Sequence, residues 1–382
     1  MSYNLLVESC PWHRRAALFD SRGRLLSLRI DDVDRPLING VVVWGRVRAV
    51  EPSLGGAFID IGDSLDGFLP LKTLPKDVRL TVGQGLMVRV TRSSFGEKGA
   101  RLDAAVSHKN PSSDVQAPQV MIPPPNAITR ALHDAGNHPV TGWIPDHRLA
   151  EEMKPYLPRV EQLDDTPSEL PDRLDMELDA MLSARPTWHL TGGNLVVEMT
   201  SAVATIDVNA GTIPGQKNIL KADAQLALNL SAAEEVARLS RLLDLGGSII
   251  IDFITPQQQA HRGMITDHLE ASFETSDDEQ VEVQRMSRAG LVEITRRRQG
   301  PSLTLLMKTP LFIAGRILLE LWRQPPGTSG GRTREALVVC APEVADILKK
   351  RLTQTACLSH LGRPVSIRPD AAMPVVSYSI SG

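Results

Sequence analysis

The chain has 382 residues and a formal net charge of −3. This length allows several compact units, and the near-neutral charge excludes a protein whose whole surface attracts nucleic acid. No apolar run is long enough to cross a bilayer and no signal peptide is recognisable, which predicts a cytoplasmic protein without a membrane partner. Cys10, Cys340 and Cys357 form no CxxC pair, so we expect reduced, buried thiols and no zinc site.

Strand patterns dominate the first part of the chain. Residues 1–36 are predicted to form two short strands around a turn at 21–23. Closely spaced short strands with glycine turns predict a small barrel over 37–108. Residues 109–126 are rich in proline, serine and glutamine and are predicted to be a linker. Helical patterns then dominate from residue 127 to about residue 183.

Strands and helices alternate between residues 186 and 303. Strands are expected at 189–205, 248–254 and 281–286, and helices at 222–243 and from Pro256 onward. This order predicts neighbouring parallel strands joined by right-handed crossovers. A helix at 311–322 and a linker at 324–332 lead to a last α+β unit over 333–382. Its strands are expected at 335–340 and 365–368, with a helix at 342–352 between them.

Two predicted strands, at 203–209 and 248–254, each carry an aspartate where an apolar residue would be expected, namely Asp207 and Asp252. A carboxylate inside a β-branched run is costly unless it is paired or binds a metal. One crossover separates the two residues, so adjacent strands would bring the carboxylates together, where a hard cation such as Mg²⁺ relieves their repulsion. Asn209 would point the same way as Asp207 and could orient a water or a phosphate oxygen. The alternative is that both aspartates only cap the turns that follow.

Basic and aromatic residues elsewhere are candidates for nucleic-acid binding. Five arginines lie between Arg285 and Arg298, and arginine binds phosphate through a planar fork. A basic run alone is more typical of a solvated helix face. On the barrel, Phe58 and Phe68 could stack bases while Lys98 follows the backbone, although each phenylalanine taken singly is more typical of a core residue.

Several blocks of the sequence resemble, in order, the catalytic core of the ribonuclease E/G family. They are Thr205-Ile-Asp207-Val-Asn209-Ala and the segments 229–238, 244–254, 286–296 and 301–303. Residues 45–71 resemble the S1 RNA-binding domain of that family. The resemblance is dense over about 37–105 and 186–303 and weaker elsewhere.

The resemblance implies an α+β multidomain fold. An S1 (OB-fold) β-barrel at 37–108 would be inserted in an RNase H-like subdomain made of 1–36 and 127–185, with 109–126 as a linker or a reduced 5′-sensor. A DNase I-like α/β catalytic subdomain would follow at 186–303. A connecting helix and linker at 304–332 would lead to a small C-terminal α+β domain at 333–382.

The resemblance also implies a Mg²⁺-dependent endoribonuclease. It would hydrolyse phosphodiester bonds of single-stranded RNA, in processing or decay, and leave 5′-phosphate and 3′-hydroxyl ends. Asp207 and Asp252 would hold Mg²⁺, for which Mn²⁺ is an alternative, and Asn209 would be the third catalytic residue. The RNA-binding residues would be Phe58, Phe68, Lys98, Arg285, Arg288 and Arg296.

The chain departs from the family in several places. Residues 304–310 stand where the zinc-link cysteines should follow Pro301-Ser-Leu303, so we expect no zinc and a monomer or homodimer rather than a zinc-linked tetramer. The 5′-monophosphate sensor is reduced to 121–126, without its arginine–threonine pair. Ala210 stands where the family usually has serine, and Thr255 replaces an aspartate.

These departures leave two rival functions open. One is an RNA-binding protein of the same fold with weak or no nuclease activity. The other is a nuclease that acts on DNA.

Overall fold

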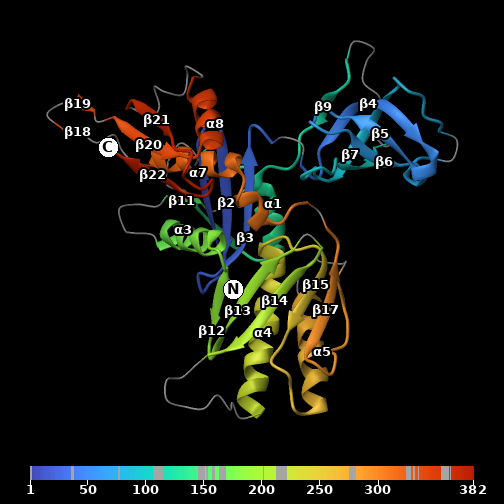
Figure 1. The fold of residues 1–382 in the computed structure, drawn as a ribbon, viewed down its shortest axis with the longest axis vertical. Coiled ribbons are helices and arrows are strands. Elements are labelled where there is room, and N and C mark those ends of the chain that lie inside the picture. Colours follow the sequence, from blue (N-terminus) through green and yellow to red (C-terminus); the bar gives the residue numbers. More distant parts are fainter. Residues whose placement is uncertain are drawn as a thin grey trace. The chain divides into compact units, whose positions relative to one another are not determined.

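The chain forms two compact units in the computed structural model (Figure 1). The first comprises Met1–Asp34, Ala127–Arg297 and Ser302–Gly382, and the second Arg35–Asn126 and Arg298–Pro301. The structure describes residues 2–35, 38–75, 78–105, 115–144, 151, 154–156, 160–162, 169–200, 202–211, 222–274, 281–298, 300–323, 328–329, 332–333, 335–353, 361 and 363–382. The predicted α+β multidomain class, with a barrel inserted in another unit, is confirmed. The finer domain boundaries stay a prediction.

The N-terminal sheet of the first unit has the strand order β11-β10-β1-β2-β3. Its elements are β1 (Tyr3–Ser9), β2 (His13–Phe19), β3 (Leu25–Asp32), β10 (Val140–Ile144) and β11 (Val160–Gln162), with helices α1 (Ala127–Ala135) and α3 (Glu169–Leu182). The segment 1–36 therefore contributes three strands rather than two. The helical prediction for 127–183 was wrong at β10 and β11. β10 pairs with β1 across more than 130 residues, and such a distant partner leaves no local signal.

A six-stranded sheet of the first unit has the order β12-β13-β14-β15-β17-β16. Its strands are β12 (Thr187–Leu190), β13 (Gly193–Met199), β14 (Ala204–Ala210), β15 (Gly247–Asp252), β16 (Val281–Val283) and β17 (Leu291–Arg296), with helices α4 (Ala222–Leu242) and α5 (Gln259–Glu274). The predicted parallel pairing is confirmed for β14 and β15. It was wrong for the third strand, because β17 lies antiparallel between β15 and β16.

The second unit is a closed five-stranded barrel with one additional strand. Its elements are β4 (Val42–Glu51), β5 (Gly56–Asp60), β6 (Gly67–Pro70), β7 (Gly85–Arg92), β8 (Arg101–Ala104) and β9 (Gln119–Ile122), with short 3₁₀ turns at Pro52–Leu54 and Leu71–Thr73. Pairing of β4 with both β5 and β7 closes the barrel. β9 pairs with β4, so the predicted linker 109–126 contains a strand, while its part up to residue 114 lies outside the described residues.

The remaining elements of the first unit lie after residue 302. They are α6 (Leu303–Met307), α7 (Pro310–Arg323), β18 (Thr328–Ser329), β19 (Arg332–Thr333), β20 (Ala336–Cys340), α8 (Pro342–Leu352), β21 (Val365–Pro369) and β22 (Tyr378–Ser381). β20 lies between β21 and β22, which adds one strand to the two predicted there. The predicted linker at 324–332 falls partly outside the described residues. Among the described helices, none has both the length and the apolar character to span a membrane.

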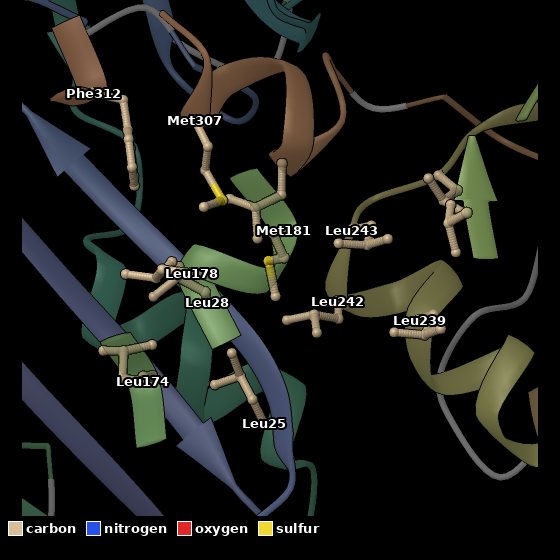
Figure 2. Close-up of a cluster of buried hydrophobic side chains, with 14 of the residues drawn as sticks. Leu25, Leu28, Leu174, Leu178, Met181, Leu239, Leu242, Leu243, Met307 and Phe312 are labelled. Atoms are coloured by element: carbon tan, nitrogen blue, oxygen red, sulfur yellow. The ribbon is translucent and has the colours of Figure 1, made fainter. Parts of the chain in front are cut away.

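One hydrophobic core connects the sheets and helices of the first unit (Figure 2). Leucines of β3, α3 and α4 meet there with residues of α6 and α7, including Leu25, Leu174, Met181, Leu242 and Met307. Cys10 and Cys340 are buried, as predicted, and burial raises the pKa of the Cys10 thiol to about 11. Cys357 lies outside the described residues.

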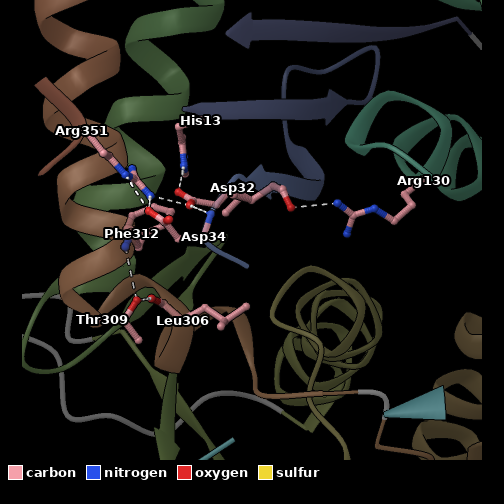
Figure 3. A network of polar contacts seen from close by, with 9 residues as sticks. His13, Asp32, Asp34, Arg130, Leu306, Thr309, Phe312 and Arg351 are labelled. Atoms are coloured by element: carbon pink, nitrogen blue, oxygen red, sulfur yellow. Dashed lines mark hydrogen bonds and ion pairs between the residues drawn. The ribbon is translucent and has the colours of Figure 1, made fainter. Parts of the chain in front are cut away.

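A buried polar network lies beside this core (Figure 3). His13 Nδ1 is 3.0 Å from Asp32 Oδ2. Arg351 of α8 donates to Asp32 Oδ1 at 2.5 Å and to Asp34 Oδ2 at 2.8 Å. The side chains of His13 and Arg351 are only 1% and 2% exposed, so these contacts fasten α8 to β2 and β3. Burial lowers the pKa of His13 from its ordinary value of 6.5, although Asp32 opposes this shift.

We expect this histidine to make stability pH-dependent. Because the folded pKa is lowered, the unfolded chain takes up a proton below pH 6.5 that the folded chain does not, so the free energy of unfolding falls as the pH decreases. One proton contributes at most about 1.4 kcal/mol per pH unit. Urea unfolding at several pH values should show that His13→Asn loses this component, whereas His133→Asn, at an exposed position, keeps it. Equal pH dependence in wild type and His13→Asn would contradict the expectation.

Candidate metal centre and nucleic-acid face

Asp207 and Asp252 are direct neighbours on adjacent parallel strands. The register of β14 and β15 pairs Thr205 with Ile250 and Asp207 with Asp252. Parallel strands lie about 4.8 Å apart and side chains at paired positions point to the same face. The structure therefore brings together the two carboxylates that the sequence singled out.

This carboxylate pair lies on the open face of the six-stranded sheet. Ile206 and Val208 alternate with Asp207 and are 1% and 5% exposed, because they belong to a buried core that includes residues of α4 and α5. Both helices lie against this sheet (Figure 1). Asp207 is half-buried and Asp252 is exposed. The apolar sequence context suggested that the carboxylates interrupt a buried strand. The structure shows that they do not. They occupy the solvent-facing positions of a strand with one covered face.

Asn209 belongs to the same group. It lies two residues after Asp207 and on the same face, and its Nδ2 donates to Asp207 Oδ2 at 2.9 Å. This bond restrains one carboxylate oxygen. An amide carries two donor hydrogens and an acceptor oxygen, so Asn209 retains capacity for a further partner.

The donor set fits a hard divalent cation. Two carboxylates at this spacing repel each other by about 1–4 kcal/mol, depending on solvent exposure, and a cation between them removes that cost. Within the described ranges, no group of three or more His, Cys, Asp or Glu side chains is arranged to hold a metal. Mg²⁺ commonly uses only one or two protein carboxylates together with waters. Asp207 and Asp252 therefore suit Mg²⁺ better than a metal that needs a complete protein cage.

Two amides of α4 hold the loop that follows Asp252. Asn229 is completely buried, and its Nδ2 donates to the Ile254 carbonyl at 2.8 Å. Gln225 Nε2 donates to the Thr255 carbonyl at 3.0 Å. These bonds anchor the chain directly after the second carboxylate. Neither amide was singled out from the sequence, because helix periodicity does not show where a polar side chain will find a backbone partner.

The loop between β16 and β17 is fastened to the same segment. Gly290 has φ +92°, and a Cβ there would lie 2.8 Å from the Phe253 carbonyl oxygen, so only glycine allows this close approach. Thr255 Oγ1 donates to the Ala289 carbonyl at 2.9 Å. Arg285 and Arg288 are exposed on this loop. The structure thus places two of the three arginines proposed from the sequence on a loop bound to the segment after Asp252.

Arg296 occupies a different position. It is 7% exposed, and its Nη1 donates to the Leu245 carbonyl at 2.7 Å and to Asp244 Oδ1 at 3.2 Å. In the register it pairs with Gly247, at the opposite end of β15 from Asp252. The structure does not bring Arg296 to the carboxylates, and its RNA-binding role stays a prediction that burial does not favour. The helix considered for this basic run is instead a strand, β17.

The second unit carries its aromatic residues on its outer surface. Phe58 and Phe68 face each other across β5 and β6, with ring centroids 5.6 Å apart at 68°. Gly56 leaves room for the Phe68 ring, which a Cβ would meet at 2.1 Å. Both phenylalanines are half-buried, while Ala57 and Ile59, on either side of Phe58 in β5, are fully buried. The two phenylalanines therefore form a solvent-accessible platform rather than barrel core.

Lys98 lies in a short turn of the same unit. It is exposed and forms an isolated bridge with Phe95, whose side chain is 44% exposed. Phe95 is a further exposed aromatic residue that was not singled out from the sequence. Phe95 follows two serines and is not part of an alternating strand pattern. The sequence therefore does not predict whether its side chain is exposed.

The buried amide of α4 leads to a test of the loop after Asp252. Asn229→Ala should leave the Ile254 carbonyl without its partner and lower the free energy of unfolding by about 1–3 kcal/mol. Amide hydrogen exchange should accelerate in residues 253–255. Gln225→Ala removes a more exposed bond and should have a smaller effect. Unchanged exchange in Asn229→Ala would show that the amide does not hold the loop.

Comparison with known proteins identifies related sequences. A model of the Ribonuclease E/G family matches residues 97–299, more than half of the chain, and a model of the S1 RNA binding domain matches 37–105. Ribonuclease G of Escherichia coli K12 is 24% identical over 461 aligned positions, covering 91% of this chain and 93% of that protein. Ribonuclease E of Haemophilus influenzae is 24% identical over 76% of this chain and 41% of its own length.

A plant protein shows higher local identity. The Ribonuclease E/G-like protein, chloroplastic, of Arabidopsis thaliana is 36% identical over 176 residues. These cover 45% of this chain and 17% of the plant protein. Together with the family model and the S1 match, these relatives confirm the resemblance found in the sequence. The chain belongs to the ribonuclease E/G family and contains an S1 RNA-binding domain.

Proposed function

We propose that the chain is a Mg²⁺-dependent endoribonuclease that hydrolyses single-stranded RNA and leaves 5′-phosphate and 3′-hydroxyl ends. The observation that carries the proposal is the register of Asp207 with Asp252 on the open sheet face. Family membership and the S1 domain support RNA as the substrate. The names of the relatives, Ribonuclease G and Ribonuclease E, agree with this reaction class.

The residues of the open sheet face would have two roles, metal binding and orientation of the reacting groups. Asp207 and Asp252 would hold Mg²⁺, for which Mn²⁺ is an alternative, and the ion would supply positive charge at the scissile phosphate. Asn209 keeps the Asp207 carboxylate oriented through its 2.9 Å bond. Its remaining amide hydrogen and its oxygen can orient a water or a phosphate oxygen on the same face.

Two groups of residues, one on each unit, would hold the RNA. Arg285 and Arg288 are carried on the loop next to Asp252, where guanidinium groups can bind the phosphate backbone. On the S1 unit, Phe58 and Phe68 would stack bases, and Lys98 would contact the backbone.

The segment after Pro301 bears on the assembly of the protein. Ser302 Oγ accepts from the Leu305 amide at the start of α6, and Leu303, Thr304 and Met307 are buried in the core of the first unit. This segment, where the zinc-link cysteines of the family were expected, therefore contributes to packing. The absence of zinc, a monomeric or homodimeric state and a cytoplasmic location stay predictions.

The carboxylate pair should be required for cleavage. With a fluorescent A/U-rich single-stranded RNA and Mg²⁺, Asp207→Asn and Asp252→Asn should each reduce the rate at least about 100-fold, because each removes a charge that holds the ion. RNA binding should persist. Glu282→Gln, which changes an exposed carboxylate of β16 on the same sheet, is the matched control and should cleave normally. Cleavage by wild type no faster than by the double variant Asp207→Asn/Asp252→Asn would leave only an RNA-binding protein.

Three further measurements complete this test. Mn²⁺ titration followed by electron paramagnetic resonance should detect a site in wild type that is lost in the double variant. A deoxy analogue of the RNA should resist cleavage, and equal cleavage of both would assign the activity to a general nuclease. Ligation of the downstream fragment would verify its 5′-phosphate.

The phenylalanine platform should contribute to binding. Phe58→Ala and Phe68→Ala should each weaken RNA binding by about 1–3 kcal/mol, the value typical of a stacked base. Fluorescence anisotropy on the Asp252→Asn background avoids cleavage during the titration. Val82→Ala removes a side chain that is 70% exposed on the same unit and serves as the control. Unchanged affinity would show that the rings contribute only to packing.

A further inference from the structure

The two phenylalanines of the S1 unit are part of a longer row across the barrel. Phe58 on β5 pairs with Phe68 on β6, Phe68 with Arg101 on β8, and Arg101 with Arg92 on β7. Residues adjacent to this row are buried inside the barrel, namely Ile59, Leu69 and Leu102. Phe58, Phe68 and Arg101 therefore face outward, while Arg92, which follows a register shift after the buried Val90, is half-buried. With about 4.8 Å between neighbouring strands, the row extends over about 14 Å.

One end of this row is aromatic and the other is positively charged. Burial lowers the pKa of Arg92, and repulsion by the positive charges of Arg101, its partner in the register, and of Arg298 lowers it further. Arg298 belongs to the same unit. Repulsion of this kind raises the free energy of the protein without an anion and is relieved when an anion binds.

Neighbouring carboxylates do not neutralise the two strand arginines. Arg92 and Arg101 form no ion pair within the part of the chain that the structure describes. The carboxylate registered nearest to them on the outer face is Asp103, which lies two residues after Arg101 on β8 and opposite Arg89. Asp60 of β5 is paired with Arg48 at 2.5 Å. The charge at the end of the row is thus available to a ligand.

We propose that Arg101 and Arg92 form a phosphate-binding extension of the aromatic platform. Bases of a single strand would stack on Phe58 and Phe68, and the phosphates next to those bases would bind the arginine forks. The two rings lie beside the two guanidinium groups, as the bases of a single-stranded RNA lie beside its phosphate backbone. The proposal rests on the proposed function for its ligand, but its residues are additional to those inferred from the sequence.

Salt dependence distinguishes a phosphate contact from a stacking contact. Single-strand binding weakens with salt in proportion to the number of phosphates contacted, with a slope of about −0.7 for each. On the full-length Asp252→Asn background, Arg101→Ala should bind a single-stranded RNA roughly tenfold more weakly at about 0.1 M salt and should lose about 0.7 of that slope. Phe68→Ala should lose affinity while the slope stays unchanged.

Matched variants make the result specific. Arg101→Lys retains the charge but not the planar fork, so it should keep the salt slope and lose part of the affinity. Arg79→Ala removes an exposed arginine of the same unit outside the row and should bind like its parent. Arg92→Ala should behave like Arg101→Ala. Arg101→Gln, together with a thermal melt of each variant, shows whether weak binding follows from lost charge or from lost folding.

The outcomes separate this proposal from the proposed function. Parent affinity and slope in both Arg92→Ala and Arg101→Ala would overturn the phosphate-binding row, whether or not the wild-type chain cleaves RNA. Weaker binding with a reduced slope would support the row even if the wild-type chain proves to be inactive, in which case only the nuclease assignment fails.

Discussion

Strands β14 and β15 run parallel in a register that pairs Asp207 with Asp252, and the opposite face of both strands is buried under α4 and α5. Side chains alternate between the faces of a strand, so burial of Ile206 and Ile251 forces both aspartates to the open side. A shift of one residue would move the carboxylates into the core and the isoleucines into water, at a cost of several kcal/mol. Hydrophobic packing therefore sets the spacing of the two carboxylates before any ligand binds.

The neighbouring contacts restrict the site further. Asn229 and Gln225 hold the carbonyls of Ile254 and Thr255, shortly after Asp252, and Gly290 lets the β16–β17 loop approach the same segment. Asn209 orients Asp207 from the same strand. A group held in this way loses little further freedom when it binds a substrate, which is the advantage of building a site on packed strands and helices.

Buried ion pairs join distant parts of the first unit. Arg15 contacts Glu8 at 2.5 Å and Asp175 of α3 at 3.0 Å, and Arg351 of α8 contacts Asp32 and Asp34. Such pairs contribute little net stability, because removing the charges from water costs about as much as their attraction returns. Their effect is selective: an arrangement of α3 or α8 that separated the partners would leave an unpaired buried charge, which is strongly destabilising.

The sequence by itself determined the elements whose signal is local and the residue types that chemistry requires. The periodic helix at 222–243, the short barrel strands, and the blocks containing Asp207, Asn209 and Asp252 could all be read from it, as could membership of the family. Only the tertiary structure decided which segments pair. In the structure, β17 lies beside β15 and β9 is added to the barrel. Arg296 is buried, and Phe68 is paired with Arg101. Pairing between strands that are distant in the sequence depends on the packing of the whole chain. A local sequence pattern therefore does not predict which strand will be the neighbour.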